Sequence, residues 1–195
     1  TDTYNVAVGY EAGGAITTGD ANTLIGGLAG DAITTGAKNV ALGKNSLGAN
    51  TAGNKAVAIG TDALATQNIT SDGDSFNVAV GYQAGTAVTT GVFNTLMGGL
   101  AGDALTDADY NIAIGGNVLS TDTLGSRSTA IGHGTLFAQN FTTATNTYNT
   151  AVGYNAGSAV TTGVQNVLIG GLAGDALTDS DENVAVGYGA LSSDT

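Results

Sequence analysis

The stretch Asn5-Val6-Ala7-Val8-Gly9 decides the fold of this chain, because its pattern returns ten more times at fixed spacing. Successive marker glycines lie 17 residues apart, except that every fourth step is 21, so the pattern has a longer period of 72 residues. A fixed period of this length is typical of a chain that winds into a solenoid. The marker glycines are Gly9, Gly26, Gly43, Gly60, Gly81, Gly98, Gly115, Gly132, Gly153, Gly170 and Gly187.

The residues before each marker glycine predict a β-strand. In positions numbered from the glycine, −3 is always β-branched, −1 is always aliphatic, and −2 is alanine or leucine. This composition favours a strand of about five residues that the glycine ends. A second stretch, such as 15–19, has the composition of another strand, and 17 residues are too few for a helical crossover of roughly 30. The sequence therefore predicts an all-β fold without helices, a parallel β-solenoid or β-roll of eleven turns.

The chain is expected to form one repetitive domain over residues 1–195, because no linker interrupts the pattern. Its 72-residue superrepeats cover 9–80, 81–152 and, incompletely, 153–195. Neither end has the atypical turn that caps a free solenoid. We therefore expect a segment of a longer fibre, or a protomer of an end-to-end filament.

Position −4 is asparagine in nine of the eleven turns, with Ala56 and Ser128 as the exceptions. Stacked turns would place these side chains about 4.8 Å apart. Amides at that spacing form a hydrogen-bonded ladder along the axis, as they do in cross-β stacks. A ligand-binding role is the alternative for the same residues. The predicted ladder comprises Asn5, Asn22, Asn39, Asn77, Asn94, Asn111, Asn149, Asn166 and Asn183.

The strand also predicts self-association. Side chains alternate between the two faces of a strand, yet positions −3, −2 and −1 are apolar or threonine in every turn. We expect one face to pack inside the coil and the other against a further copy, with the alanines and Leu24, Leu96 and Leu168 forming the layer between chains. This favours a parallel homo-oligomer, with a trimer as the preferred order. The alternative is a monomer in which small alanines lie on the surface.

Residues 5–13, Asn-Val-Ala-Val-Gly-Tyr-Glu-Ala-Gly, resemble the head repeats of trimeric autotransporter adhesins, and 55–60 and 128–132 come closest to that form. The similarity covers all eleven turns and implies a left-handed trimeric β-roll with the role of a surface adhesin. Residues 149–157 are also similar to repeats of phage tail fibres. The turns here are longer than the adhesin repeat of about fourteen residues, and no neck, stalk or anchor is visible, so the motif indicates fold better than biological role.

Composition excludes several partners. Four basic residues against sixteen acidic ones give a net charge of −12, and no basic patch is available to neutralise nucleic-acid phosphates. No apolar run approaches the roughly 20 residues of a membrane span, so no membrane insertion is expected. No signal peptide is visible, and the absence of cysteine leaves the redox compartment open.

No catalytic constellation is visible, so we predict that the protein is not an enzyme and requires no cofactor. His133 is the single histidine, it follows a marker glycine, and the chain has no cysteine. One chain therefore cannot assemble a nucleophile–base pair or a zinc set.

Aspartates gather after the second turn of each unit. Calcium takes six to eight oxygen ligands, so these carboxylates could hold Ca²⁺ between turns or chains; the alternative is that they are solvated turn residues. The candidate calcium ligands are Asp31, Asp103, Asp107, Asp109, Asp175, Asp179 and Asp181.

The 21-residue turns carry the insertions, and both contain an Asn-x-Thr sequence, at Asn68 and Asn140. These residues are candidate glycan acceptors if the host glycosylates. Inserted loops are exposed and often make variable contacts. Tyr4, Phe76 and Tyr148 follow the insertion positions, and we expect each to fill one apolar gap per unit.

Together these features predict an extracellular or cell-surface fibre, stiff and adhesive, whose repeated loops contact a surface or glycan ligand at many points. A phage tail-fibre shaft, and hence a virion location, is the alternative. Ice binding by threonine arrays is a third class, and the pairs Thr17-Thr18, Thr34-Thr35, Thr89-Thr90 and Thr161-Thr162 occur in only some turns.

Overall fold

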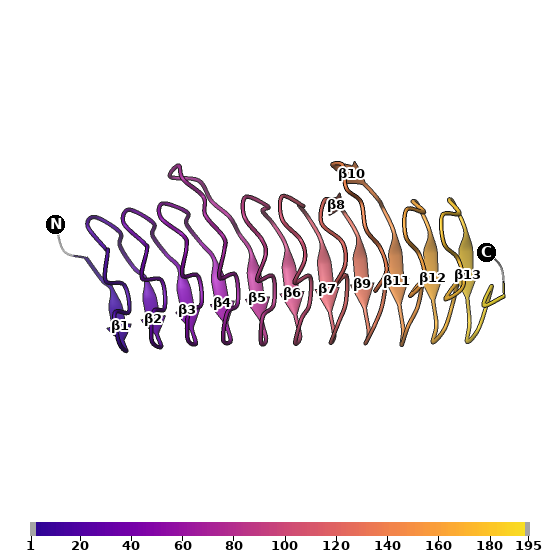
Figure 1. Ribbon diagram of the computed structural model, residues 1–195, viewed down its shortest axis with the longest axis horizontal. Coiled ribbons are helices and arrows are strands. Elements are labelled where there is room, and N and C mark those ends of the chain that lie inside the picture. The colour runs from indigo at the N-terminus through magenta and orange to yellow at the C-terminus, as the bar shows by residue number, and fades with distance from the viewer. Residues whose placement is uncertain (1–2, 194–195) are drawn as a thin grey trace.

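The computed structural model describes residues 3–193, so the ends of the predicted domain, 1–2 and 194–195, lie outside it. The chain winds as a regular rod of stacked turns (Figure 1). Within the described residues every element is a β-strand. The structure thus confirms the prediction of an all-β parallel solenoid with eleven turns.

Eleven strands of three residues, one per turn, form a single parallel sheet along the rod. Each strand pairs with the next in register, so that equivalent positions of successive turns lie side by side. They are β1 (Val6–Val8), β2 (Thr23–Ile25), β3 (Val40–Leu42), β4 (Val57–Ile59), β5 (Val78–Val80), β6 (Thr95–Met97), β7 (Ile112–Ile114), β9 (Thr129–Ile131), β11 (Thr150–Val152), β12 (Val167–Ile169) and β13 (Val184–Val186). A separate pair, β8 (Gly125–Ser126) and β10 (Thr145–Asn146), lies at the second insertion.

Within residues 3–193 the predicted second strand is absent from the turns other than those of β8 and β10, and the first strand is shorter than expected. Residues 17–18 form a bend. The amides of Thr17, Thr18 and Gly19 all donate to one carbonyl, that of Thr34, at 2.9 to 3.2 Å. A strand needs one acceptor for each outward amide, so this convergence turns the chain instead of extending it.

The marker glycines are required by both conformation and space. Gly43 has φ of +134°, a value that side-chain-bearing residues rarely adopt. A Cβ there would lie 2.5 Å from the carbonyl oxygen of Gly60 in the next turn. The glycine therefore lets consecutive turns approach to sheet spacing where each strand ends.

The inward and outward sides of the strand are the reverse of those predicted. From the second turn on, the residue at −2 is buried, and Leu24, Leu96 and Leu168 have no exposed surface. These leucines pack inside one chain, so they do not form a layer between chains. Positions −3 and −1 face outward and form the partly exposed side of the strand.

Core packing explains the 72-residue period. Leu24 occupies the space of two missing side chains, since a Cβ on Gly13 or Gly30 would lie within 3 Å of its methyl groups. One turn later the order is inverted, with the small Ala41 at −2 and the buried Leu47 at +4. Alternating large and small residues in this way keeps the interior densely packed.

Candidate functional site

Nearly all of the large apolar side chains that the rod exposes lie on the side that carries the strands. Within residues 3–193, 20 large hydrophobic side chains are exposed, and 18 of them occupy the outward strand positions −3 and −1 or the flanking positions −5 and +1. Phe137 and Leu191 are the two exceptions. We call these four columns the strand face, position −5 the first rim and position +1 the second rim. The exposed residues are Tyr4, Phe76, Phe93, Tyr110 and Tyr148 of the first rim, Val6, Ile112 and Val184 at −3, Val8, Ile25, Leu42, Met97, Ile169 and Val186 at −1, and Tyr10, Tyr82, Tyr154 and Tyr188 of the second rim.

The first rim holds a column of stacked side chains. The ring of Phe93 stacks on Phe76 and on Tyr110, with centroids 5.1 Å apart on each side. Lys55 Nζ lies 4.9 Å from the Phe76 ring centroid, and Arg127 Cζ lies 4.9 Å from that of Tyr110. Centroid spacing near the sheet repeat lets each ring stack on the next turn. The rings are therefore held in place before any partner binds.

This column corrects one sequence-based expectation. Tyr4, Phe76 and Tyr148 do not fill apolar gaps, because their side chains are 74%, 43% and 51% exposed. First-rim residues from Ala21 onward have φ between 48° and 66°. This left-handed backbone directs the residue before each buried asparagine outward.

The second rim holds tyrosine in four turns and glycine in four others. Tyr10 and Tyr82 lie 72 residues apart and are followed one turn later by Gly27 and Gly99. A Cβ at either glycine would meet no atom within 4 Å, and neither glycine has a positive φ. Neither conformation nor packing within the chain requires glycine there, so the missing side chains leave room outside it.

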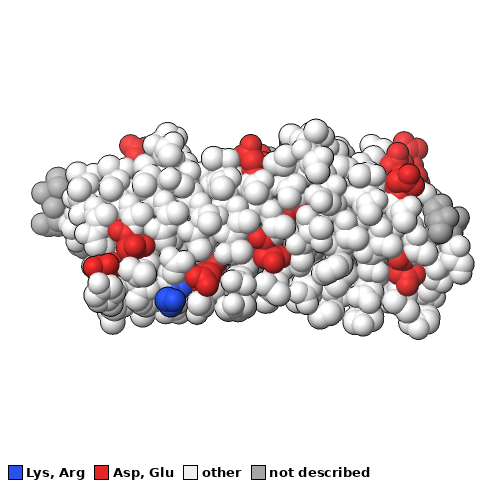
Figure 2. Space-filling model, in the orientation of Figure 1, with Lys and Arg blue, Asp and Glu red and all other residues white. Residues whose placement is uncertain are grey.

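Basic and acidic residues also lie on different parts of the rod. All four basic residues, Lys38, Lys44, Lys55 and Arg127, lie in the two rims, and Glu182 is the one acidic residue among the sixteen that does. Acidic side chains are spread along the rod in Figure 2, and most of the surface in view carries no charge. The strand face is thus apolar with basic edges on an otherwise acidic molecule.

A second ladder, of threonines at position +8, was not predicted. The hydroxyls of Thr17 and Thr34 donate to the backbone carbonyls of Thr34 and Thr51 in the next turn, each at 3.1 Å. Thr106 repeats this bond in the second unit. The 17-residue recurrence of Thr in the sequence could have revealed the column. Because these hydroxyls donate within the rod, they do not form a free outward grid.

The asparagine side chains make a regular axial network. Asn22 Oδ1 accepts the backbone amide of Asn39 at 3.0 Å, and Asn22 Nδ2 donates to the carbonyl of Gly36 at 2.9 Å. The next link runs from Asn39 Oδ1 to the amide of Ala56. Asn22 and Asn39 have no exposed surface. Their amides satisfy buried backbone groups where the coil turns into the strand.

The aspartates of the calcium hypothesis are not brought together. Asp31, Asp103 and Asp175 recur one unit apart, about 19 Å along the axis. Asp109 and Asp181 accept backbone amides of the preceding turn, at 2.7 and 2.8 Å. Within the described residues, no group of three or more His, Cys, Asp or Glu side chains is placed to hold a metal.

Two of these carboxyls have an orphaned oxygen. Oδ1 of Asp103 and of Asp175 is buried without a hydrogen-bond partner. Burial raises the pKa of the Asp103 carboxyl, while its own backbone amide lowers it by less. The Ser120 hydroxyl donates to the carbonyl of Leu100 at 2.9 Å. Asp103 and Asp107 also differ in position, since Asp107 is exposed and accepts a bond from Thr90.

The candidate glycan acceptors lie where the long turns leave the regular coil. Asn68 and Asn140 are half-buried, and their side-chain oxygens accept bonds from the hydroxyls of Thr51 and Thr123. The longer inserted segments protrude from the rod (Figure 1). The acceptor role of Asn68 and Asn140 stays a prediction.

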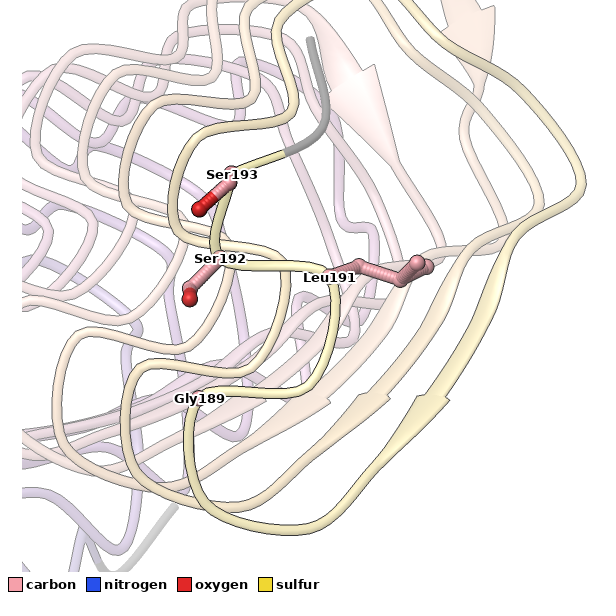
Figure 3. Close-up of a pocket in the computed structure, with 4 residues that line it drawn as sticks. All are labelled: Gly189, Leu191, Ser192 and Ser193. Carbon is pink, nitrogen blue, oxygen red and sulfur yellow. The ribbon is translucent and has the colours of Figure 1, made fainter.

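The hollow in the C-terminal turn is the open end of the core. It is lined by Gly189, Leu191, Ser192 and Ser193 (Figure 3). Leu191 occupies position +4, where Leu47 and Leu119 are fully buried under the following turn. The hollow brings no titratable or nucleophilic pair together.

His133 is exposed and its ring stacks on Tyr154 with centroids 5.9 Å apart.

No protein-family model matches the chain, and neither a curated protein nor a solved structure matches it. Residues 3–193 also include no helix long and apolar enough to cross a membrane. The strand face is therefore the feature on which a functional proposal can rest.

Proposed function

We propose that this chain is a non-enzymatic, extracellular fibre protein that assembles through its strand face into a parallel homo-oligomer, with three copies as the preferred number. The observation that carries the proposal is the gathering of 18 of 20 exposed large apolar side chains on one side of the rod. Contiguous exposed apolar surface of this kind marks an interaction site.

The size of the strand face suits a stable interface. At sheet spacing the eleven strands extend for about 50 Å, and the width from position −3 or −5 to +1 is about 13 to 20 Å. The resulting area of about 650 to 1,000 Å² brackets the roughly 800 Å² that each partner buries in a specific pairwise complex, and a trimer would divide it between two neighbours. A copy of the same chain presents an equally long and equally regular surface.

A rotation axis parallel to the rod also explains why the apolar surface runs through every turn. Closed assemblies repeat one interface around the axis, and each turn then contributes the same contact. With three copies, every strand face lies toward the axis, and the acidic surfaces and inserted loops remain outside.

The outward loops give the rod its second proposed property, multivalent contact with a cell-surface or glycan ligand. The two inserted segments repeat at 72 residues, about 19 Å of rod. Weak identical contacts at fixed spacing gain avidity without new chemistry. The same rod would serve as the shaft of a phage tail fibre, and the domains encoded beside this segment in its gene would distinguish adhesin from shaft. Ice binding is not proposed, because the Thr17 and Thr34 hydroxyls donate within the rod.

The native mass of the chain in solution tests the proposal. Light scattering coupled to size exclusion should give three times the chain mass of 18.9 kDa, unchanged on tenfold dilution. A compact monomer at micromolar concentration would overturn the proposed assembly, and a stable dimer would overturn the preferred number.

A further inference from the structure

Resting on the proposed self-association, we infer that the first rim of one copy packs along the second rim of the next at the level of the same turn, so that Phe93 and Tyr110 of the stacked column lie against Gly99 and Gly116. The partner is thus a second copy in parallel orientation and in register.

Symmetry fixes which columns meet. A rotation about an axis parallel to the rod moves no residue along that axis, and it reverses the left-to-right order of columns when two strand faces approach. Position −5 of one copy therefore faces position +1 of its neighbour at equal height, in a dimer as well as in a trimer. An antiparallel pair would place different turns opposite each other.

Two of the pairs that this register creates are complementary in size. Phe93, 43% exposed, faces Gly99 of the neighbouring copy, where a Cβ would meet nothing within 4 Å. Tyr110, 48% exposed, faces Gly116, whose space is bordered by the His133 ring. In three other turns the register sets one aromatic ring against another, as Phe76 against Tyr82. The rings are already stacked at 5.1 Å, so little side-chain freedom is lost when they are covered.

Rim charges do not decide the register, because Lys55 Nζ is already paired with Asp74 Oδ2 of its own chain at 2.5 Å. Lys55 of the first rim comes level with Asp62, which directly follows the second rim at position +2. Lys38 faces Lys44 one turn earlier; this like-charge pair lies at the edge of the interface, where solvent screens it.

The absence of native cysteine allows a direct test by disulfide trapping. The variant carrying Phe93→Cys and Gly99→Cys should, on mild oxidation, form covalent trimers in denaturing electrophoresis without reductant. Link formation within one chain is excluded, because six residues that include β6 separate the two sites by about 20 Å at strand rise, whereas a disulfide needs Cα atoms within about 7 Å.

The matched control carries Phe93→Cys and Gly27→Cys. Gly27 has the same open surroundings as Gly99, but it lies four turns, about 19 Å, away along the axis. This variant should give less than a tenth of the covalent product. Equal linking in the two variants, or none in either, would overturn the register.

The native mass of each reduced variant separates the two ideas. Trimers that fail to cross-link through Phe93→Cys and Gly99→Cys would contradict the rim pairing and leave the proposed assembly intact. Reduced variants that are monomeric, together with a monomeric parent chain, would contradict the proposed assembly itself.

Discussion

The two 21-residue turns have the same backbone plan, yet their buried polar groups are satisfied differently. In both, a glutamine accepts a bond from the following ladder asparagine: Gln67 from Asn77 at 2.7 Å, and Gln139 from Asn149 at 2.9 Å. The glutamines bridge the ladder where it lacks an asparagine, at Ala56 and Ser128. The long turns therefore repeat a solution to one problem, the gap in the amide ladder.

The two glutamines differ in the partners of their side-chain nitrogen, Nε2. Gln139 Nε2 donates to Asp122 Oδ2 at 2.5 Å and to Ser128 Oγ at 3.0 Å. Gln67 Nε2 is buried without a partner, because Asn50 and Ala56 stand where the second unit has Asp122 and Ser128. A 72-residue period thus preserves the coil more strictly than the polar network inside it.

The largest expected effect follows from removing the buried carboxylate of the second long turn. Asp122→Ala would leave the amides of Gly125 and Phe141 without their acceptor, and Gln139 Nε2 with Ser128 Oγ as its remaining acceptor. Unpaired buried groups lower stability by about 1–3 kcal/mol each, so chemical denaturation should show a loss of about 3 kcal/mol. Asn50→Ala, its counterpart in the first unit, should lose about 1 kcal/mol. Equal losses would contradict the comparison.

The next largest difference in stability between the two long turns is expected when each glutamine is replaced by an apolar residue of similar size. Gln139→Leu leaves Asp122 Oδ2 buried and unpaired, with an expected loss of about 2 kcal/mol. Gln67→Leu also loses the bond to Asn77, but it removes an orphaned donor, so the net loss should stay below about 1 kcal/mol. Thermal unfolding of both variants side by side measures the difference, and a more damaging Gln67→Leu would reverse the assignment.

A stabilising substitution should transfer one feature between the turns. Ala56→Ser would place a hydroxyl where Ser128 serves Gln139, giving Gln67 Nε2 an acceptor. A satisfied hydrogen bond adds about 0.5–1.5 kcal/mol, so the melting temperature should rise. The matched change Ser128→Ala should lower it, and a fall in both variants would contradict the role given to this hydroxyl.

The smallest effect concerns Asp103, whose buried oxygen is orphaned where both oxygens of Asp122 have partners. Because burial raises the folded-state pKa of Asp103, its ionised form weakens folding above that raised pKa, and the penalty disappears as pH falls through it. Asp103→Asn should therefore melt higher than the parent at pH 7 and equally at pH 3. A constant difference at both pH values would contradict this origin.

The repeat predicted the coil because one chemical requirement recurs in every turn. Nearly every strand needs an asparagine such as Asn22 where it begins and a glycine such as Gly43 where it ends. Both residue types therefore recur at fixed spacing in a single sequence. The orientation of the strand could not be predicted in this way, because alanine at −2 and valine at −3 are both compatible with burial. The glycines at +4, beneath Leu24, settle that orientation, and their role depends on contacts between turns.

The sequence predicts that a second face of the strand packs against a partner, and it assigns position −2 to that face. In the structure position −2 lies inside the coil, and positions −3 and −1 face outward. The sequence predicts that Phe76 fills an apolar gap, because it follows an insertion. Its left-handed backbone, with φ of 48°, turns it outward, and stacking on Phe93 is visible only once successive turns are in register. To predict which columns face outward, one therefore needs the register of successive turns as well as the residue types.

The central claim, that the strand face joins copies of the chain, is tested most directly by the sedimentation of two charge variants. Met97 on the strand face and Phe137 away from it are 40% and 47% exposed. Met97→Asp would bury a charge in the interface, which costs several kcal/mol, and the variant should sediment as a folded monomer. Phe137→Asp should keep the mass of the parent trimer. Trimers in both variants would contradict the claim.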